Sequence, residues 1–109
     1  MNESEFHQRV DDMLLAIEEA IDDTGADIDY ENAAGILTLE LENGSQIIIN
    51  RQTPIKQLWL AVRSGGYHFD WSDEAGESGG WVRDSDGAAF VEMLNQALEA
   101  QGGEALELA

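Results

Sequence analysis

The chain has 109 residues, of which 43% are apolar, which is enough for one compact domain with one core and too few for two. Its 5 basic and 23 acidic residues give a formal net charge of −18, which argues against binding to nucleic acid or to an anionic membrane surface. The lack of cysteine excludes disulfides, thiolate zinc sites and cysteine nucleophiles. We therefore expect a single domain over residues 1–109.

The first predicted element is an amphipathic helix over about residues 3–23. Asn2 and Glu5 have the spacing of a capping box at its start, and Gly25 is the kind of residue that ends a helix. The apolar side chains recur at helical spacing along one stripe: Phe6, Val10, Met13, Leu14, Ile17 and Ile21. This stripe predicts a helix that packs on a core with one face.

Strand signals fill the middle of the chain. Residues 27–31 alternate acidic and apolar side chains, which predicts a short, half-buried strand. Asn43-Gly44 is the strongest hairpin signal present, because an alternating segment flanks it on each side. The stretch 72–80, rich in glycine and acidic residues, is expected to be a connection. The other predicted strands cover residues 37–42, 46–52, 57–63, 66–71 and 81–83.

A second helix is predicted near the end of the chain. Its apolar positions are Phe90, Met93, Leu94, Ala97 and Leu98. Gly102-Gly103 stops it, which leaves a short tail containing Leu106 and Leu108. The order of one helix, a run of antiparallel strands and a second helix predicts an α+β fold, a two-layer sandwich with both helices on one face of a single antiparallel sheet.

The face of the sheet that the helices leave open is predicted to be polar. Leu58, Leu60 and Val62 take the core side of their strand, which turns Trp59 outward. The same alternation assigns these residues to the open face: Ile48, Asn50, Gln52, Gln57, Arg63 and His68. A large aromatic ring among polar groups has the composition of a protein-binding surface. Packing of Trp59 beneath a loop or the tail explains the pattern equally well.

Acidic side chains gather in the first part of the chain, where 11 of the 23 fall within 31 positions against Arg9 alone. Two like-charged pairs at i,i+4 spacing, Glu18/Asp22 and Glu19/Asp23, repel each other within the helix. They lie near its C-terminal end, where the helix dipole favours cations. We call the following side chains the acidic ridge: Glu18, Glu19, Asp22, Asp23, Asp27, Asp29 and Glu31. Its oxygens suit hard cations such as Mg, Ca, Mn and iron, weakly bound, and its charge attracts a basic protein surface. A solvated face is the alternative.

No catalytic constellation is visible in the sequence. His7 and His68 have no nucleophile at motif spacing, and neither standard phosphate-binding loop is present. His7 is expected to be a solvated residue of the first helical turn. The paired carboxylates lie on a convex helix surface, which lacks the cleft that holds one carboxyl protonated for acid–base catalysis. We therefore do not expect an enzyme.

Two segments carry a family resemblance: IIINRQTPIKQLWLA at residues 47–61 and GGYHFD at residues 65–70. They closely resemble the signature of frataxins, specifically of the bacterial CyaY type. The resemblance extends to the acidic first helix, to Asn43-Gly44 and to Trp81, and so covers nearly the whole chain. It departs from the family in residues 72–80, which are longer and more acidic, and in residues 24–26, which are sparser in acids.

The resemblance implies an iron-binding accessory protein of iron–sulfur cluster assembly, which engages a cysteine desulfurase and its scaffold and modulates cluster formation. It also implies the helix–sheet sandwich predicted above. The resemblance assigns metal binding to the acidic ridge. The expected metal is iron, ferrous or ferric, bound weakly, and other divalent cations are expected to replace it. Partner binding falls on Asn50, Gln52, Gln57 and Trp59, and we add His68 from the same open face. Bacterial members are cytoplasmic, and this chain shows no transit peptide; we expect a monomer in the absence of metal.

Two other functions remain open at this point. A small acidic mimic or inhibitor would capture a basic protein without any need for metal. A ferroxidase or iron-storage protein would consume oxygen when ferrous iron is added, although the sequence lacks a caged diiron pattern such as Glu-x-x-His.

Overall fold

The computed structural model describes residues 1–25, 27–75 and 79–108. The elements follow in the order α1 (Glu3–Thr24), β1 (Ile28–Ala33), β2 (Ile36–Leu41), β3 (Gln46–Gln52), the 3-10 turn η1 (Thr53–Ile55), β4 (Gln57–Val62), β5 (Gly65–Ser72), β6 (Gly80–Arg83) and α2 (Phe90–Ala100). All predicted helices and strands are therefore present, with ends that differ by one or two residues. Part of the expected connection 72–80, residues 76–78, lies outside the described residues.

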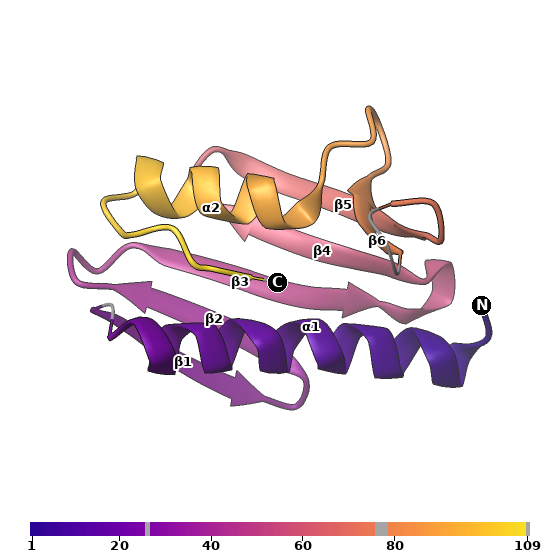
Figure 1. Ribbon diagram of the computed structural model, residues 1–109, viewed down its shortest axis with the longest axis horizontal. Coiled ribbons are helices and arrows are strands. Elements are labelled where there is room, and N and C mark those ends of the chain that lie inside the picture. The colour runs from indigo at the N-terminus through magenta and orange to yellow at the C-terminus, as the bar shows by residue number, and fades with distance from the viewer. Residues whose placement is uncertain (26, 76–78, 109) are drawn as a thin grey trace.

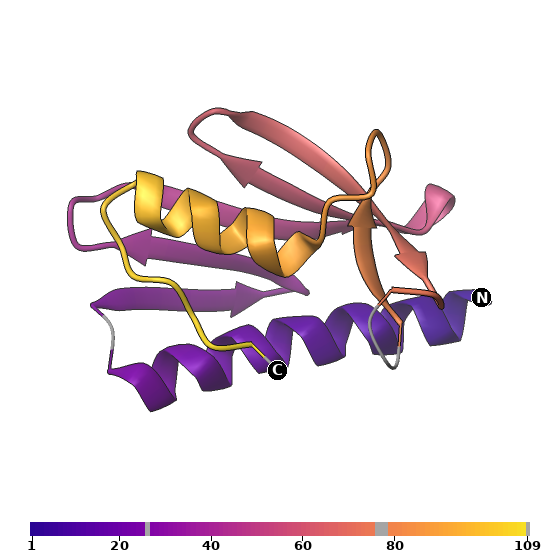
Figure 2. The same ribbon diagram turned by 45° about the horizontal axis from the view of Figure 1, so that its top comes forward.

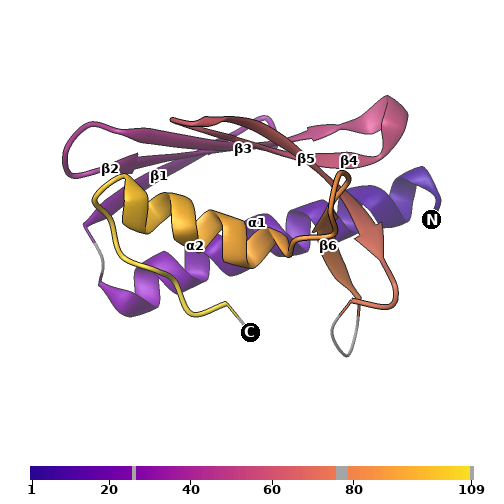
Figure 3. The ribbon, with the colours of Figure 1, turned by 90° about the horizontal axis from the view of Figure 1, so that it is seen from above.

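The six strands form one antiparallel sheet in which spatial order follows chain order, β1-β2-β3-β4-β5-β6. The two helices lie side by side on one face of this sheet and run in the same direction, as Figure 1 shows. Seen from above, the sheet and the helices form two layers (Figure 3). The predicted two-layer α+β sandwich is thus confirmed.

Helix α1 begins and ends where its sequence specifies. The Asn2 side chain accepts from the Glu5 backbone N–H at 2.8 Å and Glu5 Oε1 accepts from the Asn2 N–H at 3.2 Å, which completes the capping box. Gly25 follows the helix with φ +65°, the left-handed conformation that glycine adopts without strain. The predicted apolar stripe faces the sheet, with Phe6, Val10 and Ile17 fully buried.

The β2–β3 hairpin turns at the predicted position. The Leu41 carbonyl accepts from Gly44 N–H at 2.9 Å, and Asn43 Oδ1 accepts from Ser45 N–H at 2.9 Å. Gly44 has φ +85°, which explains why a glycine stands here. The hairpin brings the inward residues Leu39 and Ile47 opposite each other, and both are fully buried in the core between sheet and helices.

The end of α2 is tied to two turns of the sheet through a buried side chain. Gln101 is 4% exposed, accepts from Arg63 N–H at 2.9 Å, and donates to Ser45 Oγ and to the Gln46 carbonyl, the latter at 3.3 Å. The chain then turns back along the helices, as Figure 2 shows. Asn95 and Leu106 exchange two hydrogen bonds, at 3.0 and 2.8 Å, and Leu106 is buried. The tail therefore belongs to the core.

Among the described residues, no helix is both long enough and apolar enough to cross a membrane.

Candidate functional site: two polar surfaces on adjoining sides of the sheet

Six of the eight carboxylates of α1 form two rows along the helix, because residues three, four or seven apart lie near one line. We call Asp11, Glu18 and Asp22 the sheet-side row, and Asp12, Glu19 and Asp23 the solvent-side row. The last turn of α1 contains no basic residue, so no positive side chain there offsets the repulsion between the helix dipole and the carboxylates. The two rows have the same charge, but they differ in what they contact.

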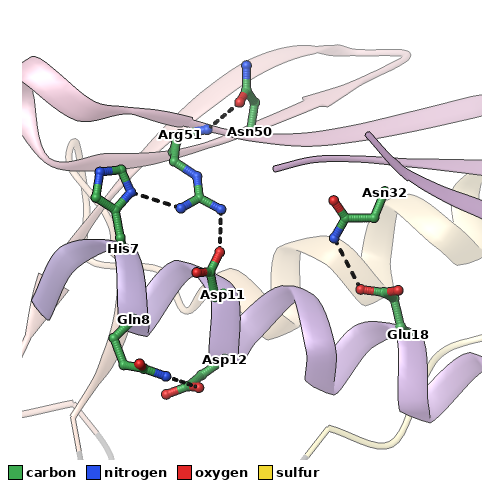
Figure 4. A network of polar contacts seen from close by, with 8 residues as sticks. All are labelled: His7, Gln8, Asp11, Asp12, Glu18, Asn32, Asn50 and Arg51. Carbon is green, nitrogen blue, oxygen red and sulfur yellow. Dashed lines mark hydrogen bonds and ion pairs between the residues drawn. The ribbon is translucent and has the colours of Figure 1, made fainter. Parts of the chain in front are cut away.

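The sheet-side row is bonded across to the sheet. Its three carboxylates each accept a hydrogen bond: Asp11 from Arg51 at 2.6 Å, Glu18 from Asn32 at 3.3 Å, and Asp22 from the Tyr30 hydroxyl at 2.9 Å. The first two contacts are drawn in Figure 4. These bonds fix the rotamers of the row and attach α1 to β1 and β3.

The Tyr30–Asp22 contact has an electrostatic consequence. The pKa of Tyr30 is raised above its usual value near 10, first because the phenol donates a hydrogen bond to Asp22, then through desolvation and the charges of Asp22 and Glu18. Ionisation of the phenol would place two negative charges at hydrogen-bond distance. Tyr30 therefore remains a neutral donor through the physiological pH range.

The solvent-side row differs from its neighbour in having no bond to the sheet. Asp12 accepts from Gln8 of the same helix at 2.8 Å, which Figure 4 also shows. Glu19 and Asp23 are exposed and accept no hydrogen bond from any described residue. Their carboxylates are available to an incoming cation or basic side chain without first breaking a contact.

The strand part of the acidic ridge does not continue the helix rows. Tyr30 and Asn32 reach α1 from the inner face of β1, so the alternate residues Asp29 and Glu31 project from the outer face, where both are exposed. Asp29 pairs with Glu40 of β2, a like-charged cross-strand pair that the sequence analysis did not identify. The ridge therefore wraps around the free edge of β1.

Asp27 lies apart from both groups, at the end of the sandwich. It lines a hollow of about 90 Å³ together with Glu42 and Glu104, which come from the β2–β3 turn and the tail. Sequence reasoning missed both carboxylates: the packing of the tail brings Glu104 near residue 27, and Glu42 lies near it because the adjacent residues Ile28 and Leu41 pair in the sheet. Within residues 1–25, 27–75 and 79–108, no three His, Asp or Glu side chains converge in a way that could hold a metal ion. Metal binding by the ridge stays a prediction.

His7 is not the solvated residue that we expected. Its Nδ1 atom lies 2.9 Å from Arg51 Nη1, and its side chain is 38% exposed. Because a guanidinium only donates, His7 must accept through Nδ1, so the proton of the neutral ring is on Nε2, which lies 3.6 Å from Glu3. Figure 4 shows Arg51 between His7 and Asp11. The sequence pattern missed this contact, since Arg51 is 44 residues away.

The predicted partner-binding residues of the open face lie next to one another in the sheet. Asn50 pairs with Trp59 and Trp59 with His68, which forms one row across β3, β4 and β5, while Gln52 pairs with Gln57 at the end of the sheet. The strand alternation that predicted this set is confirmed, because Leu58, Leu60 and Phe69 are fully buried on the opposite side. These residues form one continuous polar strip.

Trp59 is less exposed than the strand alternation predicts. It is half-buried, and His68 and Gly66 of the neighbouring strand β5 contact its ring. Its ring stacks on the His68 imidazole with centroids 5.8 Å apart and planes 12° apart, and Nε1 lies over Gly66, where a Cβ would approach to 2.8 Å. Trp59 Nε1 and His68 Nδ1 are buried without a hydrogen-bond partner among the described residues. The close approach of the indole to the backbone makes Gly66 part of this surface.

Comparison with known proteins identifies a family to which the chain is similar. The family model of the frataxin-like domain matches residues 1–104. A curated relative from Pseudomonas aeruginosa is 50% identical over 107 residues, which cover 98% of this chain and 96% of the relative. One from Vibrio vulnificus is 48% identical over the full length of both chains. Both relatives are named iron–sulfur cluster assembly protein CyaY.

Solved structures give the same result. Frataxin from Psychromonas ingrahamii superposes with a TM-score of 0.89 at 40% identity, over 100% of this chain and 99% of that one. Trimeric frataxin from Saccharomyces cerevisiae, complexed with ferrous iron, has a TM-score of 0.68 at 28% identity, over 84% of this chain and 83% of that one. From the family model, the curated relatives and the shared fold together, the chain belongs to the frataxin family, of the bacterial CyaY type.

Proposed function

We propose that this protein is an iron-binding accessory factor of iron–sulfur cluster assembly that binds a cysteine desulfurase and its scaffold and modulates the rate of cluster formation. The names of its relatives support the assembly role. The observation that carries the proposal is the presence of two surfaces on adjoining sides of one sheet. One is the acidic ridge around the edge of β1, and the other is the strip that contains Asn50, Trp59 and His68. We place this activity in the cytoplasm and in a monomer when metal is absent.

The metal in this proposal is cargo that exchanges with solvent. The donor set consists of carboxylate oxygens, which suits ferrous or ferric iron and other hard cations. Since the described carboxylates do not converge in threes, binding is expected to be weak and poorly selective. Yeast frataxin complexed with ferrous iron supports iron as the relevant cation. Glu19 and Asp23 are the first ligands we expect, because no described hydrogen bond has to break.

The two surfaces contribute to different stages of partner recognition. The ridge attracts a basic surface over a distance of about a Debye length, roughly 10 Å at 0.1 M salt, and so raises the association rate. The strip makes contact only after encounter, where the stacked Trp59 and His68 rings offer aromatic surface to the partner. Loss of the ridge should therefore slow association, and loss of the strip should speed dissociation.

Calorimetric and kinetic titration into purified cysteine desulfurase tests the proposal, at low and high salt, with ferrous iron and with chelator. Trp59→Ala should weaken binding about equally at both salt concentrations, with Gln46→Ala, on the same face outside the strip, as control. Glu19→Lys with Asp23→Lys should lower the association rate chiefly at low salt. Equal salt sensitivity of both variants would refute the separate roles of the ridge and the strip. Absence of binding in every condition would refute the cysteine desulfurase as partner.

The titration tests one of the two alternatives, and a separate assay tests the other. An inhibitor that works without metal predicts identical binding with iron and with chelator. A ferroxidase predicts oxygen consumption when ferrous iron is added to the protein alone, which an oxygen electrode measures directly.

A further inference from the structure

One exposed apolar side chain lies in the middle of the acidic helix surface. Leu15 is 54% exposed and is the only large apolar residue exposed on an α-helix in the described part of the chain. At about 100° per residue, it lies on the side of α1 opposite the buried stripe that contains Val10, Leu14 and Ile17. Core packing therefore does not explain a leucine at this position.

Carboxylates surround Leu15 on every side along the helix. Positions three and four residues away on a helix are its surface neighbours, and here these positions are Asp11, Asp12, Glu18 and Glu19. Two of them belong to the sheet-side row, whose side chains are held by Arg51 and Asn32. The other two belong to the solvent-side row. Leu15 thus lies between a carboxylate row with fixed rotamers and one that faces solvent.

This arrangement matches one half of a mixed interface, with an apolar centre and a charged rim. Its charge determines what can cover it. An apolar or acidic surface would bury the rim carboxylates without partners, at a large desolvation cost, whereas Lys and Arg side chains would pair with them. Only a partner with basic side chains around an apolar depression satisfies both the leucine and its rim.

We propose that Leu15 is the apolar anchor of the α1 surface, and that it docks into an apolar depression rimmed by basic side chains on the partner protein. The inference rests on the proposed function in taking the cysteine desulfurase as that partner. It adds a short-range contact to a surface that otherwise acts only through charge. Association through α1 is then specific as well as fast, because a basic surface without the depression leaves Leu15 exposed.

The size of the effect follows from the exposed fraction. About half of the Leu15 surface remains to be buried, and half of the transfer free energy of a leucine corresponds to about a five-fold change in Kd. This contribution is apolar, so it does not depend on salt in the way that the rim does. Leu15→Gln removes it with little effect on the helix, because Leu and Gln have similar helix propensities.

The first test is desulfurase binding by Leu15→Gln at low and high salt. We expect Kd to rise about five-fold in both conditions, with the change in the dissociation rate. Leu15→Met is the matched control, because methionine keeps an apolar side chain of similar size and helix propensity at the same position, and it should leave Kd unchanged. A Kd for Leu15→Gln equal to that of the wild type would overturn the inference and leave Leu15 as a helix former.

A second test decides the inference independently of the desulfurase. Wild-type protein is titrated with two synthetic peptides of equal charge, one alternating lysine and leucine and one alternating lysine and serine. The wild type and Leu15→Met should prefer the leucine peptide about five-fold, and Leu15→Gln should show no preference. Equal preference in all three proteins would overturn the inference. If the desulfurase does not bind the wild type at all, the proposed partner fails, and the peptide titration alone decides the role of Leu15.

Discussion

Two double substitutions in α1 remove the same charge but should have different effects on stability. Glu19→Gln with Asp23→Asn neutralises two carboxylates of the solvent-side row. Glu18→Gln with Asp22→Asn neutralises two of the sheet-side row at the same i,i+4 spacing. Each variant reduces the net negative charge by two, so the pair is matched for overall charge and for distance from the helix end. Only the second pair accepts hydrogen bonds from the sheet.

The solvent-side variant should be more stable than the wild type. Removing a like-charged i,i+4 pair relieves about 0.2–0.5 kcal/mol, and removing a carboxylate from the last turn relieves about 0.3–1 kcal/mol of unfavourable dipole interaction. The sum is about 0.5–1.5 kcal/mol, or a rise in Tm of about 2–6 °C for a domain of this size at low salt. The sheet-side variant gains the same relief, but its bonds to Tyr30 and Asn32 lose their charge assistance, which roughly halves their strength. Its Tm should rise by at most half as much.

Differential scanning calorimetry at low and high salt measures both variants against the wild type. The difference between them should persist in high salt while both rises shrink, because salt screens the repulsion more than it screens a direct hydrogen bond. Equal rises in Tm for the two variants would refute the distinction between the rows. An unchanged Tm in both would mean that the carboxylates of α1 are too well solvated to repel each other.

Three further changes test other contacts. Tyr30→Phe should lower the free energy of unfolding below about pH 10, as urea unfolding measures. Because the folded-state pKa of Tyr30 is raised, the difference in stability from the wild type should disappear as pH rises through that pKa. Gln101→Leu removes the side-chain partner of the part-buried Arg63 N–H and Gln46 carbonyl and should lower the free energy of unfolding by about 1–3 kcal/mol, seen as a lower urea midpoint. Gly66→Ala places a Cβ 2.8 Å from Trp59 Nε1, so the indole N–H resonance of Trp59 should shift and desulfurase binding should weaken.

Each of these three expectations has a result that contradicts it. A constant stability difference for Tyr30→Phe across the alkaline range would mean that the phenol does not depend on the carboxylate. Wild-type stability of Gln101→Leu would mean that water replaces the lost amide. An unmoved Trp59 resonance in Gly66→Ala would place the indole elsewhere on the sheet.

The fold followed from the sequence because its signals are local. The capping box at Asn2, the Asn43-Gly44 turn and the period-two pattern through Leu58 and Leu60 each depend on neighbours within a few residues. Helix and strand ends were accordingly placed to within one or two residues. The bonding of Gln101 to the turn at Ser45 was not visible, because 56 residues separate them and only tertiary packing brings them together.

The candidate site was predictable in composition but less so in geometry. Strand alternation placed Asn50, Trp59 and His68 on one face, yet it says nothing about the rotamer that stacks Trp59 on His68. Periodicity also gave the two carboxylate rows of α1, but not which row the sheet would bind. That depends on Tyr30 and Asn32, whose side chains reach the helix only because β1 pairs at the edge of the sheet.

The strict order of the sheet has a further consequence, for how the chain acquires its structure. Each strand pairs with the one made just before it, so every pairing closes a short loop and costs little loop-closure entropy. Local pairing of this kind is associated with fast folding. During synthesis, each new strand meets a neighbour that is already present, whereas the apolar stripe of α1 is fully covered only after β6 is made, because Phe6 packs against Trp81. The order in which the strands are synthesised is therefore also the order in which they pair in the sheet.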